Sequence, residues 1–372
     1  MKIRITALSF FMVMAMVFSL QAGEPIKIGV IFARTGPATP DSGSGFNAAR
    51  FAAHEVNRAG GVLKSPIQLL EFDNKSTPLG SRMAARNAIA QGAVCVIGAA
   101  WSSHSLAMAR ELQKAKIPMV SPSSTLPAIT LVGDHIFRGC YTDAFQGKVL
   151  ANFALEDLNA RTAVVLTNTN SRYSMGLSRH FSRHFQKKGK LIWEGDYSRN
   201  ATDFSTLLTQ VLAFDPHVVF IPDHFRESAY IIKQAKKMGI KAIFLGGDGW
   251  IKTMYRYGGN AIHGSYRTVP WDAHGADENG QLFIRRYTKE YPEPVETNTA
   301  HTYDAFHLVV DAIKRAGSAT PASIRKALAE TKNFQGVTGT ITFNSNGDPI
   351  NRPVIILRFD NKGSVLHKRV TP

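Results

Sequence analysis

Short apolar runs alternate with segments of helical spacing along most of the chain. Residues 26–32 form a run rich in β-branched side chains, and residues 46–57 then carry apolar side chains at helical intervals until the Gly60-Gly61 pair. Such a run predicts a strand, and glycines just past a periodic segment predict the end of a helix. The alternation continues with predicted strands at 67–72, 94–98 and 118–121 and predicted helices at 81–91, 103–114 and, as a short turn or helix, near Leu126.

A second series with the same rhythm follows the first. Its predicted helices lie at 145–158, 175–187, 204–212 and 228–238, and its predicted strands lie at 163–167, 191–195, 218–222 and 242–246. The run Val218-Val-Phe-Ile221 is apolar throughout, which is typical of a parallel strand covered on both faces. The two series predict an α/β protein with two lobes, each a doubly wound parallel sheet.

The last part of the chain has a different order. Three helices are predicted at 280–291, 302–315 and 322–329, and strands follow near 338–343 and 354–359. A polar turn at 344–348 separates the two strands, and Asn361-Lys-Gly363 favours a closing hairpin. Because no Pro-rich linker interrupts the chain, we expect short strands to join the lobes.

The N-terminus has the composition of an export signal. Lys2 and Arg4 precede an apolar run at 5–20, and Ala22 offers a cleavage site. The length of this run leaves an uncleaved membrane anchor as the alternative. Removal of residues 1–22 from 372 leaves 350, enough for two domains with cores of their own. We therefore expect a periplasmic protein whose mature chain has no stable membrane insertion.

Composition narrows the classes of partner. The formal net charge is +16, but the basic residues are scattered and no aromatic-rich basic module accompanies them, so we exclude a nucleic-acid binder. A solvated basic surface is the simpler interpretation. Cys95 and Cys140 are the only cysteines. A disulfide between them and two free thiols both stay open.

The sequence contains no familiar catalytic motif. It has no Gly-x-Ser-x-Gly, no P-loop and no Gly-x-Gly-x-x-Gly. His180 and His184 are four residues apart on a predicted helix, but Arg179 and Arg183 beside them would repel a cation. We therefore predict a protein that is not an enzyme and that uses no cofactor and no metal.

Two strand ends offer hydroxyls and backbone N–H groups to an anion. Residues 98–105 follow one predicted strand, and residues 120–125 cover the end of the next. Helix starts bind carboxylates, and open α/β folds bind ligands at the carboxyl ends of strands. In the second series, Asp248 lies between two glycines after a strand and is either a turn residue or a presented carboxylate. For Tyr173 and Trp101, a packing role and a ligand contact both remain open interpretations.

Several short motifs, taken in order, resemble those of a known family. They are Ile26-Lys-Ile-Gly-Val30, Thr35-Gly-Pro37, Phe46-Asn-Ala-Ala-Arg50, Asn57-x-x-Gly-Gly61, Ile97-Gly98, Val120-Ser-Pro122, Thr125, Asp203-Phe204 and Gly246-Gly-Asp-Gly249. The chain from Ile26 to near its end is similar to type I periplasmic binding proteins, above all the leucine/isoleucine/valine-binding proteins of ABC importers. The resemblance implies lobes joined by three crossover strands, near 140–142, Pro270 and Asn351. The implied division is a signal peptide at 1–22, lobe 1 at 23–141 and 271–350, and lobe 2 at 142–270 and 351–372.

The resemblance also implies how lobe 1 binds its ligand. In such proteins a Ser and a Thr of the first lobe hold the α-carboxylate of an amino acid, and Ser102 and Thr125 match these positions. Ser123 and Ser124 match the residues just before that Thr, whose carbonyl and amide groups contact the head group.

From lobe 2, Tyr173 matches a tyrosine that closes over the ligand. Asp248 matches the acidic residue that pairs with the α-ammonium, which is Glu in closely related binders. The side-chain pocket departs from its relatives at Asp41, Trp101, His224 and Phe225, and Ser123 and Ser124 are more polar than the small apolar residues often found there. A polar or aromatic amino acid is therefore as open as an aliphatic one.

The resulting hypothesis is an exported solute-binding protein that captures a small amino acid between its lobes and delivers it to an ABC permease and its ATPase. The amino acid could be branched-chain, otherwise aliphatic, polar or aromatic. Two alternatives stay open: a binder of urea or a short amide with the same fold, and a sensory receptor module that signals without transport.

Overall fold

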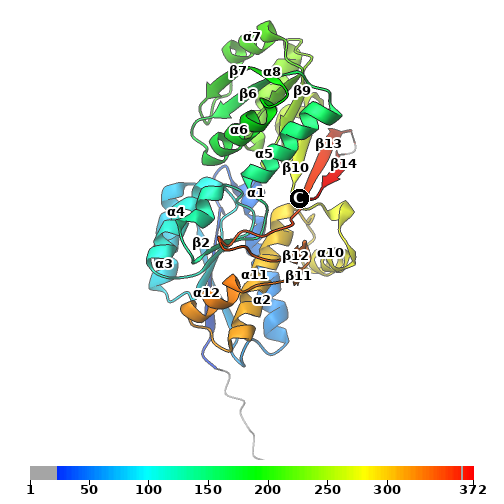
Figure 1. Cartoon of the computed structure of the whole chain (residues 1–372). Coiled ribbons are helices and arrows are strands. Elements are labelled where there is room, and N and C mark those ends of the chain that lie inside the picture. Colours follow the sequence, from blue (N-terminus) through cyan, green and yellow to red (C-terminus); the bar gives the residue numbers. More distant parts are fainter. Residues whose placement is uncertain (1–22, 362) are drawn as a thin grey trace, which may run out of the picture.

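The computed structural model describes residues 23–361 and 363–372. The chain forms two lobes, one above the other in Figure 1, each built around its own sheet. The predicted export signal at 1–22 lies outside the described residues. Within the described residues, no helix combines the length and the hydrophobicity that a membrane span needs.

Lobe 1 contains a five-stranded parallel sheet with the order β2-β1-β3-β4-β5. Alternate strand residues point to opposite faces, so Ile28 and Val30 belong to one core and Val96 to the other. The strands are β1 (Ile26–Phe32), β2 (Ile67–Asp73), β3 (Cys95–Gly98), β4 (Met119–Ser121) and β5 (Ile136–Arg138). The first core contains residues of α2 (Ser44–Arg58) and α11 (Thr297–Ala316), and the second contains residues of α3 (Pro78–Ala90) and α4 (Ser102–Lys114).

Lobe 2 contains a seven-stranded sheet with the order β14-β13-β10-β9-β8-β6-β7. Strands β6 to β10 pair in parallel, whereas β13 and β14 are antiparallel additions at one edge. The strands are β6 (Thr162–Asn168), β7 (Lys190–Tyr197), β8 (Val218–Phe220), β9 (Ile243–Gly246), β10 (Tyr266–Val269), β13 (Val354–Asp360) and β14 (Gly363–Val370). The helices are α5 (Asp143–Asn152), a π-helical continuation at Phe153–Asp157, α6 (Arg172–Phe185), α7 (Ser205–Phe214), α8 (Phe225–Lys237) and α9 (Met254–Gly258).

The tail of the chain is shared between the lobes. Residues of α10 (Glu278–Glu290), α11 and α12 (Pro321–Ala329) belong to the core of lobe 1. The hairpin β11 (Phe334–Gly336) and β12 (Gly339–Ile341) forms a small sheet of its own, whereas β13 and β14 join the sheet of lobe 2. The chain therefore passes between the two sheets after β5, after β10 and before β13. The predicted α/β class with two parallel-sheet lobes is confirmed.

Several elements differ from the sequence predictions. The apolar pattern does not predict β5 or β10, because each is short and includes an arginine, Arg138 or Arg267. Helix α11 begins at Thr297 rather than at residue 302, because its first turns bury polar side chains that hide the helical period. Cys95 and Cys140 are free buried thiols, so the disulfide alternative is wrong.

Candidate functional site

A cavity of about 90 Å³ lies between the lobes at the carboxyl ends of the strands. A single water takes about 10–15 Å³ of such space, so the cavity suits a small molecule rather than a stretch of chain. Eight of the ten predicted site residues line it: Asp41, Trp101, Ser102, Ser123, Thr125, Tyr173, His224 and Asp248. Ser124 and Phe225 do not line it.

The wall contributed by lobe 1 begins at the first turn of α4. Ser102 is the first residue of this helix, so the free N–H groups and the positive end of the helix dipole lie at the cavity. The Ser102 Oγ accepts a hydrogen bond of 3.3 Å from the Leu126 N–H, which ties this edge to the next strand end. Thr125 also lines the cavity and is almost fully buried. The arrangement offers neutral donors to an anion.

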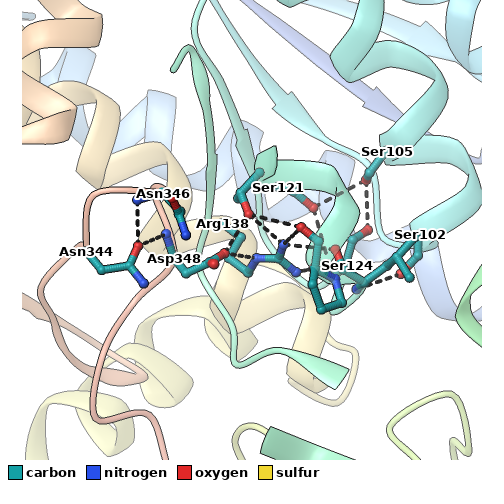
Figure 2. Close-up of polar contacts among 11 residues, drawn as sticks. Ser102, Ser105, Ser121, Ser124, Arg138, Asn344, Asn346 and Asp348 are labelled. Atoms are coloured by element: carbon teal, nitrogen blue, oxygen red, sulfur yellow. Dashed lines mark hydrogen bonds and ion pairs between the residues drawn. The ribbon is translucent and has the colours of Figure 1, made fainter. Parts of the chain in front are cut away.

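Ser124 supports this wall from behind. Its Oγ donates to the Ala100 carbonyl at 2.8 Å and lies 2.8 Å from the Ser105 Oγ, which is 3.3 Å from the Ser121 Oγ. Figure 2 shows these three serines gathered beside the strand ends, with Ser102 at the margin of the group. The Ser124 hydroxyl is thus used inside the protein, and Ser124 does not line the cavity.

Arg138 holds the same loop in place. Its side chain is completely buried, and its Nη1 and Nη2 donate to the carbonyls of Ser124 and Leu126, both at 2.9 Å. Its Nε donates to the Asp348 carboxylate at 2.5 Å, so the cation is paired (Figure 2). Asp348 belongs to the predicted polar turn, where its N–H donates to the Asn344 Oδ1 at 3.0 Å. Sequence reasoning missed Arg138, because nothing in its short strand marks it as a residue of the site.

Lobe 2 contributes a carboxylate. Asp248 follows β9, and its Oδ1 accepts hydrogen bonds of 2.8 Å from the Tyr173 hydroxyl and from the Gln146 Nε2. The Tyr173 Oη in turn accepts from the Gly249 N–H at 3.1 Å. Burial raises the pKa of Asp248, and the bonds from Gln146 and Tyr173 oppose this rise. Gln146, on α5, was not predicted from the sequence.

The residues on either side of Asp248 must be glycines, because a Cβ at either position would clash with its neighbours. A Cβ at Gly247 would collide with the Tyr173 hydroxyl, and a Cβ at Gly249 would lie 2.7 Å from the Asp223 carbonyl. The Gly-Asp-Gly run therefore lets Tyr173 reach the carboxylate. This close approach explains why Asp248 is a presented carboxylate and not only a turn residue.

Stacked rings connect the two walls. Trp101, just before α4, stacks on His224 of lobe 2 with ring centroids 3.6 Å apart and an interplanar angle of 12°. The stack continues from His224 to Tyr173, whose ring centroids are 5.3 Å apart. Burial lowers the pKa of His224 well below its usual value, so the imidazole is neutral. Phe225 instead packs on Tyr257 at the start of α8, away from the cavity.

Further charged groups line the cavity beside these residues. The Trp101 Nε1–H donates to the Asp41 Oδ2 at 2.8 Å, and burial raises the pKa of Asp41 to about 7 against this bond. Lys252, Arg267 and Glu296 also line the cavity and were not predicted. Arg267 lies in the unpredicted strand β10, and Glu296 immediately precedes α11, whose start was placed too late in the sequence. The site is thus more charged than an aliphatic pocket.

Comparison with known proteins gives this cavity a family context. The sequence profile described as "Periplasmic binding protein" matches residues 25–364. The chain belongs to the periplasmic binding protein family. Its resemblance to the Leu/Ile/Val-binding group, inferred above from short motifs, is confirmed.

The relatives of this periplasmic binding protein match it over nearly their whole length. Leu/Ile/Val-binding protein homolog 3 of Brucella melitensis is 27% identical over 92% of this chain and 94% of its own. The leucine-, isoleucine-, valine-, threonine- and alanine-binding protein of Pseudomonas aeruginosa is 25% identical over 88% of each chain.

Solved structures agree with these relatives. The leucine-binding protein LivK of Thermotoga maritima superposes with a TM-score of 0.89 at 30% identity, covering 93% of this chain and 99% of its own. LivJ of Streptococcus pneumoniae, in complex with isoleucine, superposes with a TM-score of 0.88 at 29% identity, covering 94% and 100%.

These proteins are binding proteins, and this periplasmic binding protein is likewise a solute-binding protein and not an enzyme. Among the residues that the structure describes, no group of three or more His, Cys, Asp or Glu could hold a metal ion. His180 and His184 therefore have no third ligand of these types within that part of the chain.

Proposed function

We propose that this protein captures an α-amino acid in the interlobe cavity and delivers it to an ABC importer. The observation that carries the proposal is the opposition of two walls: neutral hydroxyl and N–H donors on lobe 1, and the Asp248 carboxylate on lobe 2. A zwitterion presents the complementary groups.

The lobe 1 wall suits the α-carboxylate of this ligand. Ser102 and Thr125 supply hydroxyls, and the start of α4 supplies backbone N–H groups. Charge-assisted hydrogen bonds of this kind contribute about 1.5–3 kcal/mol each. A ligand without a carboxylate would forfeit several of them.

The lobe 2 wall suits the α-ammonium. Tyr173 and Gln146 orient the Asp248 carboxylate and oppose the rise of its pKa that burial causes, and Asp248 has no ion pair with any described residue. An ammonium would provide that pair. Because the two head groups contact different lobes, the ligand stabilises the closed arrangement that the Trp101–His224 stack also favours.

Titration calorimetry with the standard amino acids tests this proposal, using protein that has been unfolded and refolded to remove co-purified ligand. The tightest ligand is then compared with its analogue lacking the α-ammonium and with its analogue lacking the carboxylate. We expect each loss to weaken binding by about 10-fold or more, since 1.4 kcal/mol corresponds to 10-fold. Unchanged affinity for either analogue would contradict the proposal.

Urea and acetamide belong in the same titration, because a binder of small amides would use Asp248 to accept N–H groups. We expect both to bind far more weakly than an amino acid.

Delivery and location are tested in cells. The tightest ligand, radiolabelled, should enter a strain lacking this gene more slowly than it enters the parent strain. The mature chain, cut after Ala22, should be recovered from the periplasm. Normal uptake in the deletion strain would favour a sensory role.

A further inference from the structure

Four charged side chains line the cavity besides Asp248. Asp41 and Glu296 come from lobe 1, and Lys252 and Arg267 come from lobe 2. The Lys252 Nζ lies 3.7 Å from the Glu296 carboxylate, which forms an ion pair between the lobes. Asp41 and Arg267 make no ion pair with any of the residues that the structure describes. They are the two charges at the cavity, apart from Asp248, that have no ion-pair partner among the described residues.

Arg267 is a buried cation with unused donors. Its side chain is 4% exposed, and its one hydrogen bond to a described residue runs from Nη1 to the Trp250 carbonyl. The Phe359 ring lies 5.3 Å from its Cζ and offers a face rather than a counter-charge. A guanidinium has five N–H donors, and leaving a buried cation without acceptors is unfavourable. The cavity is where a ligand can supply an acceptor.

Asp41 lies on the opposite lobe, and its carboxylate is short of donors, just as the Arg267 guanidinium is short of acceptors. Its Oδ2 accepts one hydrogen bond, from the Trp101 Nε1–H, and no cation among the described residues lies within ion-pair distance. Burial raises the pKa of Asp41, the charges of Asp248 and Glu296 add to the rise, and the charge of Arg267 opposes it. Asp41 and Arg267 therefore share one electrostatic neighbourhood. A carboxylate here is best satisfied by an N–H donor of the ligand.

The combination selects a neutral group that both donates and accepts. Asp41 and Glu296 together balance Lys252 and Arg267, so a charged ligand side chain would meet a like charge whichever sign it carried. A hydrocarbon side chain would leave Arg267 without an acceptor. A carboxamide or ureido group supplies a carbonyl to Arg267 and an N–H to Asp41 at once.

We propose that the ligand is an amino acid whose side chain ends in a carboxamide or ureido group, held between Asp41 of lobe 1 and Arg267 of lobe 2. The inference rests on the proposed function, and it adds a second bridge between the lobes. Sites built to hydrogen-bond a polar group discriminate strongly against analogues that lack it. Selectivity should therefore be largest against shape-matched hydrocarbons.

Titration calorimetry at pH 8 tests the inference with asparagine, glutamine and citrulline against leucine, aspartate, glutamate and lysine. Leucine and asparagine have side chains of nearly the same shape, and aspartate and glutamate are the charged counterparts of the amides. We expect one of the three amide or ureido ligands to bind at least 10-fold more tightly than each of the other four. Tighter binding of leucine than of all three would overturn the inference.

Three variants locate the effect. Arg267→Met should weaken the preferred amide ligand at least 10-fold and change leucine binding less than 3-fold, and Asp41→Asn, which keeps an acceptor for Trp101, should act in the same direction. Arg358→Met is the matched control, because Arg358 is an exposed residue of the neighbouring strand β13. If Arg267→Met fails to fold, Asp41→Asn still decides. An unchanged ratio of amide to leucine affinity in the folded variants would contradict the inference.

The outcomes also separate this inference from the proposed function. If leucine binds and the amide ligands do not, only the inference fails. If acetamide binds as tightly as glutamine, the distal site stands and the amino-acid proposal fails. If none of the amino acids binds, both fail.

Discussion

The two walls of the cavity offer different groups to the proposed zwitterion. Lobe 1 would meet its carboxylate with hydroxyls and a helix start, and the lobe 1 cation Arg138 lies behind the wall, paired to Asp348. Lobe 2 places its carboxylate, Asp248, at the wall itself and surrounds it with neutral donors. At the proposed head-group site, lobe 1 therefore offers a fixed frame of neutral groups, whereas lobe 2 offers a carboxylate that would gain a partner when ligand binds.

The difference predicts where a substitution acts. Behind the lobe 1 wall, the loop is tied by many buried bonds, so damage there should lower stability and affinity together. At the surface of either wall, side chains that contact ligand should change affinity while the fold remains. The four predictions below run from the largest expected effect to the smallest.

Arg138→Met should have the largest effect. It removes a completely buried cation, leaves the partly buried Asp348 carboxylate without its ion pair, and frees the carbonyls of Ser124 and Leu126. The free energy of unfolding should fall by about 3–5 kcal/mol. Ligand affinity should fall as well, because the loop that contains Thr125 loses its anchor. Chemical denaturation and calorimetry measure the two losses. Wild-type affinity in this variant would show that the loop needs no support.

Ser102→Ala should lower affinity by about 10-fold, the equivalent of 1.4 kcal/mol, with a smaller change in stability. Its hydroxyl lines the cavity and accepts one bond, from the Leu126 N–H. Ser124→Ala is the matched comparison, since its hydroxyl contacts only protein groups and should affect thermal stability more than affinity. If calorimetry and thermal melts instead showed the affinity loss in Ser124→Ala and the stability loss in Ser102→Ala, the anion contact would belong to Ser124.

His224→Ala should lower affinity by roughly 3–10-fold, about 0.7–1.4 kcal/mol, because it removes one ring of an interlobe stacked pair. Phe225→Ala separates this effect from damage to lobe 2, since Phe225 packs in the core of that lobe. We expect Phe225→Ala to melt at lower temperature with an affinity within about 3-fold of wild type. Equal affinity losses in the two variants would argue against the stack as a closing contact.

Asp143→Asn should have the smallest effect on ligand affinity, and it should appear as a pH dependence of stability. Burial raises the pKa of Asp143 from its usual 3.8 to about 8, and the nearby charge of Asp248 adds to the rise. The folded state thus holds this proton more tightly than the unfolded state, so the wild-type residue loses stability as pH rises between these values. Melting curves should show the variant gaining on wild type from pH 5 to pH 8. A difference that does not change with pH would contradict this account.

Much of the cavity wall could be predicted because it lies at the ends of apolar parallel strands. Ser102, Thr125 and Asp248 each follow a run that the hydrophobic pattern detects, and neighbouring strand ends meet at one edge. Resemblance to known binding proteins then gave each residue a role.

The rest of the site could not be predicted, for a physical reason. Arg138 and Arg267 are buried in β5 and β10, and an arginine interrupts the apolar pattern by which short strands are found. Both strands were missed together with the arginines they contain. The placement of Ser124 behind the wall also depends on side-chain direction, which sequence order does not reveal.

The central claim is that Asp248 and the α-ammonium of the ligand contact each other across the cleft. The most direct measurement is a calorimetric cycle: the tightest amino acid and its analogue lacking the ammonium, each titrated into wild type and Asp248→Ala, with the exposed Asp196→Ala as control. We predict that losing the ammonium weakens binding at least 10-fold in wild type and in the Asp196 variant, but less than 3-fold in Asp248→Ala. An equal loss in all three proteins would show that Asp248 does not hold the ammonium.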